Sequence, residues 1–541
     1  MIQWIKKLWN KESGGLTAAA IIIGVSSAGS RVLGVVRDRV LASIFGAGHE
    51  LDLYYAAFRL PDTVYTLLII GALSAGFIPV FAETIEKYGK EQAKKLVSQL
   101  LVVVGVILLV AAIGIVITAP MLLPLVFPSF KGEYLEQLVF LTRIMALSPF
   151  LLGLSSVAGG VLQVTKRYVA FAVAPMLYNI GIIIGAGFFG EQYGIQAVAW
   201  GVIAGAFAHA ASQLVAISSM GFVGFERFRG FAKGLKQILQ LMGPRILGLG
   251  VSQFSLTVLL SIAAFTGAGS VSALQFATNL QSFPLGVFGL SLAMAAFPLL
   301  SQSYAKEEFE SFRKTFSSAT RQIFFFLLPS TAIFFLLRAQ IVRLVLGQGR
   351  FDWTDTILTA DILGYLAFAL VAQALIPLFA RAFYSMQNTW LPFLVGLFGE
   401  AFTIFCAWTF REELGSIGIA IAIAVGSWIQ LLLHAFLLRR TFGKYAKGDS
   451  FVSAYKTTVA TIAFCVAGFP VREYLGTIFP LRTVWQLALQ AGGTLLAGGL
   501  AFFIVANLVK SEELAELIQT VKRRLWKRVG SKNLDEEGIL L

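Results

Sequence analysis

Long apolar segments alternate along the chain with short polar connections. A run of about 20 apolar residues is long enough to cross a bilayer as a helix. The pattern therefore predicts an all-α membrane protein with about fourteen transmembrane helices. They are expected near Leu16–Phe45, Leu51–Ala82, Leu96–Leu122, Leu135–Val164, Tyr168–Phe189, Ile195–Val223, Ile238–Phe265, Val271–Tyr304, Phe316–Leu346, Ile357–Tyr384, Trp390–Phe410, Ile417–Leu438, Val459–Tyr474 and Val484–Val509.

Composition agrees with this class, because 57% of the 541 residues are hydrophobic and only 13% are charged. Soluble domains carry about 25% charged residues. The net charge of +14 comes from short Lys/Arg clusters between apolar runs. The positive-inside rule explains clusters of this kind, so we expect no nucleic-acid partner.

The clusters fall on one side of the predicted helix count. They include Lys87 to Lys95, Lys166/Arg167 and Arg439/Arg440, whereas the connection from His49 to Asp52 has no Lys or Arg. Both termini are therefore expected in the cytoplasm.

A weak internal repeat is also present. The sequences FGAG at Phe45 and FTGAG at Phe265 each precede a helix, and the motifs YGKE at Tyr88 and YAKE at Tyr304 follow at a similar distance. The offset of about 220 residues predicts two pseudo-symmetric lobes of six helices around a central cavity, an arrangement found in transporters.

We expect five parts: an interfacial segment over 1–14, an N-lobe over 15–224, a C-lobe over 225–450, two further helices over 451–510, and a cytoplasmic amphipathic tail over 511–541. In the tail, Ser511 is placed to cap a helix that begins with Glu512 and Glu513. Its apolar and basic faces favour a membrane surface.

Charged residues lie inside apolar sequence near the start of the chain. Arg31, Arg37, Asp38 and Arg39 continue the first predicted helix, and Asp52 and Arg59 belong to the second. An Arg or Asp at the centre of a membrane helix costs roughly 2.5 to 3.5 kcal/mol, so this cluster should face a polar cavity. Arg31 and Asp38 share a helix face, which makes Asp38 a candidate counter-ion.

Guanidinium groups suit a diphosphate, because their planar donors bind oxyanions bidentately and stay charged. Other embedded polar residues are expected to bridge helices by hydrogen bonds. These are Asn179, Gln253, Gln275, Gln281, Gln373 and Gln430.

Other kinds of site find little support in the sequence. The two cysteines, Cys406 and Cys465, lie in apolar runs, and the three histidines are far apart, so no metal site is expected. No paired carboxylates on sizeable loops and no Walker A motif are present, which disfavours an enzyme or a pump that uses ATP directly.

The run SRVLGVVRD followed by ASIFGAG, Asp52 and AAFRLPD resembles the opening of the MurJ (MviN) family of lipid II flippases, which belongs to the multidrug/oligosaccharidyl-lipid/polysaccharide exporter superfamily. The resemblance implies a carrier that moves the diphosphate-sugar head of lipid II from the cytoplasmic to the outer leaflet by alternating access, with the last two helices holding the lipid tail. It also implies that Arg31, Arg37, Asp52 and Arg59 bind substrate.

Two positions depart from the family pattern. Where the family has arginines in its second and eighth helices, this chain has Tyr65 and Asn279. Together with Asp38 and Arg39, these are further candidate substrate residues. The departures leave open an exporter of another undecaprenyl-linked oligosaccharide, whereas an arginine-rich cavity disfavours a multidrug or cation antiporter.

The remaining expectations concern energy, partners and location. No cofactor is expected, and the membrane potential would drive an anion outward by about 2.3 kcal/mol per charge per 100 mV, with ion coupling left open. We expect a monomer in the bacterial inner membrane whose partners are lipid II and membrane lipids.

Overall fold

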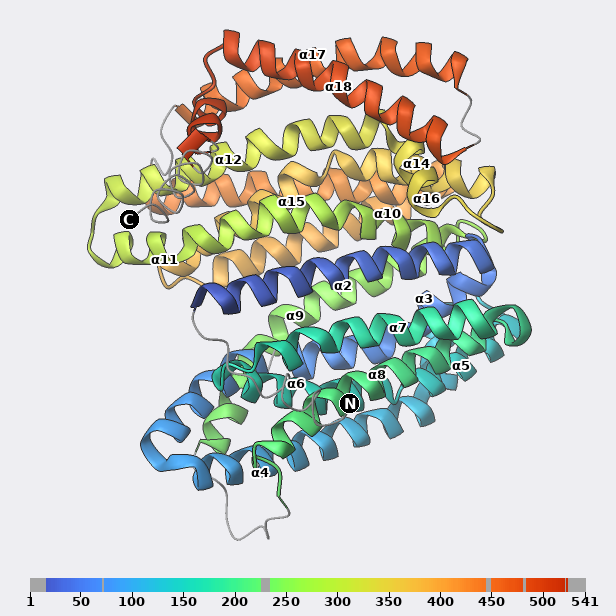
Figure 1. The fold of residues 1–541 in the computed structure, drawn as a ribbon, viewed down its shortest axis with the longest axis vertical. Coiled ribbons are helices and arrows are strands. Elements are labelled where there is room, and N and C mark those ends of the chain that lie inside the picture. Colours follow the sequence, from blue (N-terminus) through green and yellow to red (C-terminus); the bar gives the residue numbers. More distant parts are fainter. Residues whose placement is uncertain are drawn as a thin grey trace, which may run out of the picture. The chain divides into compact units, whose positions relative to one another are not determined.

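The apolar segments form helices throughout the computed structural model (Figure 1), which describes residues 16–70, 73–224, 234–443, 449–479, 483–520 and 522–523. No strand occurs among these residues. The predicted interfacial segment over 1–14 and most of the tail lie outside them. The elements are α2 (Leu16–Phe45), α3 (His49–Tyr65), η1 (Thr66–Ile70), α4 (Leu73–Val126), α5 (Glu133–Met145), α6 (Ser148–Val164), α7 (Tyr168–Tyr193), α8 (Ile195–Ser219), α9 (Leu235–Ala264), α10 (Ser270–Pro284), η2 (Leu285–Leu290), α11 (Ser291–Ala305), α12 (Phe309–Leu336), α13 (Arg338–Leu346), α14 (Trp353–Ala367), α15 (Leu370–Ser385), α16 (Trp390–Phe442), α17 (Asp449–Ile478) and α18 (Val484–Leu508).

These elements are consistent with the fourteen predicted segments. The first has the predicted bounds, Leu16–Phe45. The long helices α4 and α16 each pass through a glycine with positive φ, Gly89 (φ 75°) and Gly415 (φ 56°), where a non-helical backbone separates two helical parts. Within the described residues, nine helices are long and apolar enough to cross a membrane, or ten if the bent pair α14 and α15 is one span.

Several predicted spans are interrupted. The segment predicted over Phe316–Leu346 ends its helix at Leu336, and the short helix α13 follows. The second and eighth predicted spans each contain a π-helix, η1 and η2, which the apolar pattern does not reveal. The two π-helices lie about 220 residues apart, the same offset as the FGAG/FTGAG repeat, so the repeat extends to the local helix geometry.

The chain forms two compact units. The first contains Met1–Phe276, Val345–Leu358 and Ala407–Ile419, and the second contains Ala277–Leu344, Thr359–Cys406 and Ala420–Leu541. Helix α9 thus belongs to the first unit. The predicted lobe boundary at residue 224 stays a prediction, because compactness in one conformation does not define which helices move together.

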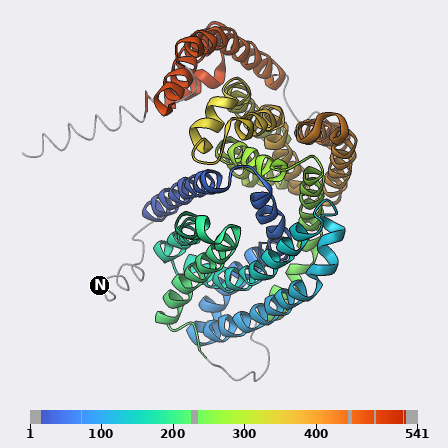
Figure 2. The ribbon, with the colours of Figure 1, turned by 90° about the vertical axis from the view of Figure 1, so that its right-hand side faces the viewer.

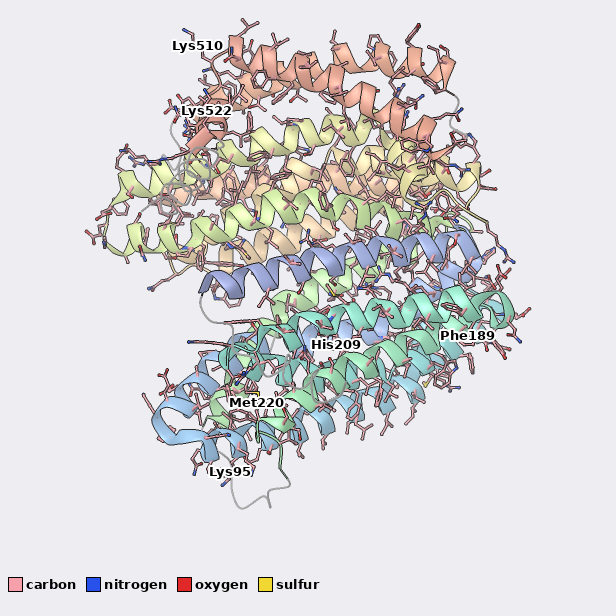
Figure 3. The ribbon with its side chains drawn as sticks, viewed as in Figure 1. Lys95, Phe189, His209, Met220, Lys510 and Lys522 are labelled. Atoms are coloured by element: carbon pink, nitrogen blue, oxygen red, sulfur yellow. The ribbon has the colours of Figure 1, made fainter. Side chains whose placement is uncertain are left out.

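The first unit is a bundle of roughly parallel helices (Figure 2) with a core between α4, α6 and α8 that includes Phe77, Phe81 and Leu96. Helices α7 and α8 approach closely because glycines face each other: a Cβ on Gly181 would lie 2.4 Å from Gly205 Cα. Small residues let membrane helices pack in this way. Lys95 and Met220 lie at one end of this bundle and Phe189 at the other (Figure 3).

The second unit has a core between α11, α12 and α15, and α17 and α18 lie side by side (Figure 1). The start of the predicted tail is helical over 512–520, and Ser511 Oγ accepts a hydrogen bond from Leu514 N at 3.4 Å, which confirms the predicted cap. Arg321 on α12 lies 2.7 Å from a carboxylate oxygen of Glu512. Leu514 is buried against Phe325 and Ala460, so the first turns of the tail pack on protein rather than on lipid.

Candidate functional site

The charged residues at the start of the chain all belong to the first unit, where Arg37 and Arg59 have separate partners. Arg37 on α2 donates to Asp38 Oδ1 through Nε (3.0 Å) and Nη2 (2.8 Å), and its Nη1 donates to Asn179 Oδ1 on α7 (3.2 Å). Asp38 is therefore a counter-ion, but its partner is Arg37, not the Arg31 that shares its helix face. Asn179 bridges α2 and α7, as predicted, because its Oδ1 accepts from Arg37, while its Nδ2 donates to the carbonyl of Pro175 one turn earlier on α7 (3.1 Å).

Arg59 on α3 is the most deeply buried of the predicted cations, with 6% of its surface exposed. Its Nη2 donates to Gln253 Oε1 on α9 at 2.9 Å, and its Nη1 lies 3.5 Å from Asp62 Oδ2. The Nε of Arg59 has no hydrogen-bond partner among the described residues. A buried donor without a partner costs about 1–3 kcal/mol. An oxyanion that accepts a hydrogen bond from this Nε would remove that cost, which favours its binding.

Arg31 and Arg39 differ from these two. Arg31 is exposed on α2 and makes no hydrogen bond or ion pair with the part of the chain that the structure describes. Arg39 donates through Nε to Gln348 Oε1 at 3.0 Å, in the segment between α13 and α14. Arg39 thus has a structural contact, whereas the Arg31 guanidinium is exposed.

Asp52 occupies a different position from the arginines. It is 2% exposed, and its two carboxylate oxygens accept hydrogen bonds from Gly269 N (2.7 Å) and Ser272 N (2.8 Å). Gly269 directly precedes α10 and Ser272 lies in its first turn, where free backbone donors attract negative charge. In this conformation Asp52 caps a helix from outside, and its substrate role stays a prediction.

A second carboxylate repeats this arrangement nearby. Asp355 on α14 accepts a hydrogen bond from Ala47 N at 2.9 Å, and Arg350 N donates to the carbonyl of Ser43 at 2.8 Å. The turn between α2 and α3 is therefore held by the segment before α14. The sequence offered no signal for this contact, because its partners are about 300 residues apart.

The two departures from the family pattern lie in different units. Tyr65, at the end of α3, forms a 3.2 Å hydrogen bond between its hydroxyl and Ser156 Oγ on α6. Asn279 is half-buried on α10, where its carbonyl accepts a hydrogen bond from Ser282 Oγ at 2.6 Å. Tyr65 thus points towards the interior of the first unit and supplies a neutral hydroxyl where the family has a positive charge.

Sequence reasoning missed three features of the first unit: Asp62 beside Arg59, Asp355 at the turn, and an interior pocket that includes His209. Asp62 follows Arg59 by three residues, a spacing that places the two side chains on the same helix face and so could have indicated the ion pair. Within the described residues, no cluster of three or more His, Cys, Asp or Glu side chains is arranged to hold a metal ion.

Several known proteins are similar to this chain in sequence and in fold. The family model described as "Lipid II flippase MurJ" matches residues 41–487. A "Probable lipid II flippase MurJ" of Rhizobium meliloti (strain 1021) is 28% identical over 516 residues, which cover 93% of this chain and 95% of the relative. A solved structure of "Lipid II flippase MurJ, inward closed conformation" is similar with a TM-score of 0.75, at 22% identity, over 90% of this chain and 98% of that one.

A transporter of the MOP superfamily has a similar fold. An inward-facing multidrug resistance MATE transporter of the MOP superfamily is similar with a TM-score of 0.64, at 18% identity, over 77% of this chain and 95% of that transporter. At this identity the likeness concerns the fold alone. With the family model matching most of its length, the chain belongs to the lipid II flippase MurJ family.

Proposed function

We propose that this protein moves lipid II from the cytoplasmic to the outer leaflet of the bacterial inner membrane by alternating access, and that Arg31, Arg37 and Arg59 hold the diphosphate. The observation that carries the proposal is Arg59, a buried guanidinium in a membrane protein whose Nε lacks a partner in the described chain. Ionisable residues inside membrane proteins are rare and often mark substrate or ion pathways.

The carboxylates beside the arginines have a role in this proposal. Asp38 and Asp62 compensate Arg37 and Arg59 when no substrate is present, which lowers the cost of keeping the two cations in the membrane. A diphosphate carries more charge than one carboxylate and offers more acceptor oxygens, so it competes for the same donors. Because the carboxylates remain nearby, the diphosphate is also released more easily at the outer leaflet.

The membrane potential is the driving force we propose. Moving an anion outward across an inside-negative membrane is favourable by about 2.3 kcal/mol per charge per 100 mV. The protein needs no cofactor in this scheme. The substrate-free site, with more basic than acidic groups, is drawn back towards the inside by the same field.

Membrane topology and the path of the tail complete the proposal. Both termini lie in the cytoplasm, the protein acts as a monomer, and α17 and α18 hold the lipid tail. Large apolar side chains on these two helices are exposed, among them Val466 (68%) and Leu496 (70%), which gives a polyprenyl chain an apolar surface.

Complementation tests the proposal directly. Cells depleted of their own lipid II flippase are expected to grow when they express this chain and to stop growing when they express its Arg59→Ala variant at equal membrane abundance. Failure of the wild-type protein to restore growth, while it is present in the membrane, would favour export of another undecaprenyl-linked oligosaccharide, the reading that Tyr65 and Asn279 leave open.

A further inference from the structure

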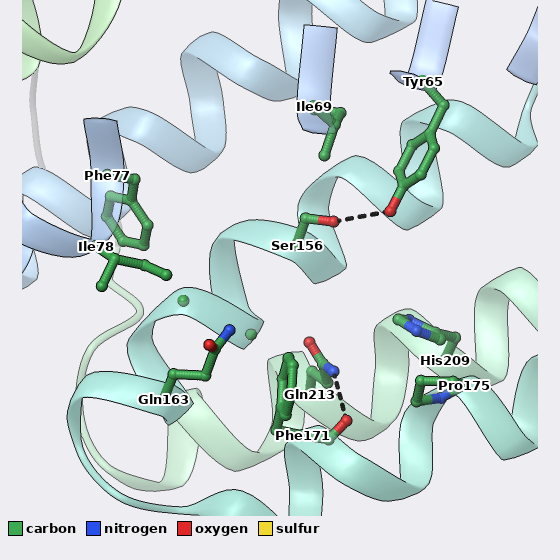
Figure 4. A pocket seen from close by; sticks show the side chains of 12 residues that line it. Tyr65, Ile69, Phe77, Ile78, Ser156, Gln163, Phe171, Pro175, His209 and Gln213 are labelled. Carbon is green, nitrogen blue, oxygen red and sulfur yellow. Dashed lines mark hydrogen bonds between the residues drawn. The ribbon is translucent and has the colours of Figure 1, made fainter. Parts of the chain in front are cut away.

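A pocket of about 290 Å³ lies inside the first unit, between α3, η1, α4, α6, α7 and α8 (Figure 4). Tyr65, Phe171, Gln163 and His209 are among the side chains that line it. The volume is at the lower end of the range for small-molecule sites, roughly 300–1,000 Å³. There is room for one ring-sized group, but not for a complete head group.

The lining of this pocket is neutral. None of the described residues around it is Lys, Arg, Asp or Glu, so neither a phosphate nor an ammonium group finds a counter-charge there. The lining instead combines aromatic rings, Tyr65, Phe77 and Phe171, with side-chain amides and hydroxyls. This combination suits a neutral group with an apolar ring face and several hydrogen-bonding substituents.

Two polar groups at the pocket remain available to a ligand. The Gln163 amide points into the space (Figure 4) and makes no hydrogen bond with any described residue. His209 is bonded through Nδ1 to Ser155 Oγ at 2.7 Å, which leaves its Nε2 without a partner in the described part of the chain. By contrast, Gln213 is engaged, since its Oε1 accepts from Ser155 Oγ at 3.2 Å.

Glycines on α6 create the space. A Cβ on Gly160 would lie 2.6 Å from the Phe77 ring, and one on Gly159 would lie 2.9 Å from Gln213 Oε1. A larger residue at either position would therefore overlap a side chain that lines the pocket, and one of the two would have to shift. The sequence of α6 thus keeps this cavity open, although a filled core would pack better.

Two helices connect the pocket to the predicted substrate arginines: α7 leads towards Arg37, and α3 carries Arg59. On α7, Pro175 lines the pocket, and its carbonyl binds Asn179, the residue that holds Arg37. On α3, Tyr65 follows Arg59 by six residues, about 9 Å along the helix axis. The pocket therefore begins about 9 Å from Arg59 along α3, a distance that a long arginine side chain and a diphosphate-linked sugar can span together.

We propose that this pocket receives one sugar ring of the lipid-linked head group, with its hydroxyl and acetamido substituents hydrogen-bonded by Gln163 and His209 and its apolar face against Phe171 or Tyr65. This inference rests on the proposed function and adds a second recognition site to it: the arginines bind the diphosphate, and the neutral pocket distinguishes what is attached. Tyr65 then belongs to the sugar site, which explains why no cation is needed at that position.

Binding measurements with two ligands test the sugar site. The purified full-length protein is titrated with lipid II and with undecaprenyl diphosphate, which has the same diphosphate and tail but no sugar. Gln163→Leu removes the amide at nearly constant volume, and Phe171→Leu removes the ring. Gln196→Leu on the exposed side of α8 is the matched control, because it makes the same chemical change away from the pocket.

We expect Gln163→Leu and Phe171→Leu to weaken lipid II binding by roughly three- to tenfold, the worth of one neutral hydrogen bond or ring contact, and to leave undecaprenyl diphosphate binding within twofold of wild type. Unchanged diphosphate binding also shows that each variant is folded. Arg37→Ala should weaken both ligands.

Three results would overturn the inference. Normal lipid II binding by both pocket variants would refute the sugar site and leave the proposed function intact, provided that Arg37→Ala still weakens both ligands. Equal weakening of both ligands would show a general structural effect of the pocket. Binding of neither ligand by the wild-type protein would refute the proposed function itself, and with it the sugar site.

Discussion

The positive charge of Arg37 is balanced within its own helix, by the carboxylate of the next residue, and it is oriented by an amide from another helix. Asp38 is only 7% exposed, so it depends on Arg37 as much as Arg37 depends on it. Loss of Arg37 removes its ion pair and two hydrogen bonds from the buried Asp38 carboxylate. A substitution at Arg37 therefore changes stability as well as ligand binding.

For this reason Arg37→Ala is expected to abolish transport and also to lower the free energy of unfolding by about 1–3 kcal/mol, because the buried Asp38 carboxylate loses its hydrogen bonds from the guanidinium. The double variant Arg37→Ala/Asp38→Asn should recover most of the thermal stability but none of the transport. Thermal unfolding in detergent and a flippase assay in vesicles measure the two effects separately. Recovery of transport in the double variant would show that Arg37 has no role beyond compensating Asp38.

Arg31 should behave differently, because it is exposed and has no partner among the described residues. Arg31→Ala is expected to abolish transport with no measurable change in thermal stability. Arg31→Lys should restore part of the activity, since an ammonium keeps the charge but lacks the bidentate donors. Transport at the wild-type rate by Arg31→Ala would exclude this residue from the site.

Among the elements, the second and eighth predicted spans share the same interruption, a π-helix after the first half of the span. π-helices within α-helices are rare and occur often at functional sites. In the first unit, η1 directly follows Tyr65 and contributes Ile69 to the neutral pocket. The helix break is therefore located where the sugar site is proposed.

The start of the eighth span is held by Asp52, and this contact predicts the effect of a conservative substitution. Asp52→Asn replaces one acceptor oxygen with an NH₂ group that faces a backbone N–H, so the cap loses a hydrogen bond and the negative charge. We expect a loss of about 1–2 kcal/mol in the free energy of unfolding.

Thermal unfolding of the purified variant provides the measurement. Ser272→Ala is the comparison, because its backbone N–H still donates to Asp52 and the negative charge remains, while its hydroxyl contacts with the carbonyl of Gly269 and with the Asp52 carboxylate are lost. A smaller shift for this variant is expected. An Asp52→Asn variant as stable as wild type would mean that the cap contributes nothing to this conformation.

At the scale of the whole molecule, the family and the fold agree on a transporter. Membership in a flippase family confirms the prediction that the chain is a transporter rather than an enzyme, and the all-helical fold with at least nine apolar spans in its described part confirms the predicted fold class. Which side each loop occupies remains a prediction from the charge pattern.

Cysteine labelling checks that orientation. In a Cys406→Ala/Cys465→Ala background, a membrane-impermeant maleimide added to intact cells should modify His49→Cys and spare Lys90→Cys. Both positions are exposed at the protein surface, so the difference in labelling reports the side of the membrane. Permeabilised cells, in which both cysteines react, are the control, and the reverse pattern in intact cells would invert the proposed topology.

The sequence by itself was sufficient for the class, the order of the spans and the family. The length and apolarity of a segment are local properties. A run of about 20 apolar residues in a bilayer forms a helix, because the helix satisfies its own backbone hydrogen bonds. The first span was predicted with its observed bounds, Leu16–Phe45, for this reason. The charges at Arg31, Arg37 and Arg59 could also be recognised, because they are conspicuous in apolar surroundings.

Only the tertiary structure decided which groups meet. Arg37 binds Asn179, Arg59 binds Gln253, and Asp52 caps a helix more than 200 residues away. The neutral pocket likewise combines four stretches of the chain, 65–78, 156–163, 171–175 and 209–213, and its His209 looked isolated in the sequence. A helix that is apolar on every side has no single apolar face in its sequence, so the sequence does not show which side contacts a neighbouring helix. In a membrane, side-chain packing and hydrogen bonds between distant residues decide which helices pair.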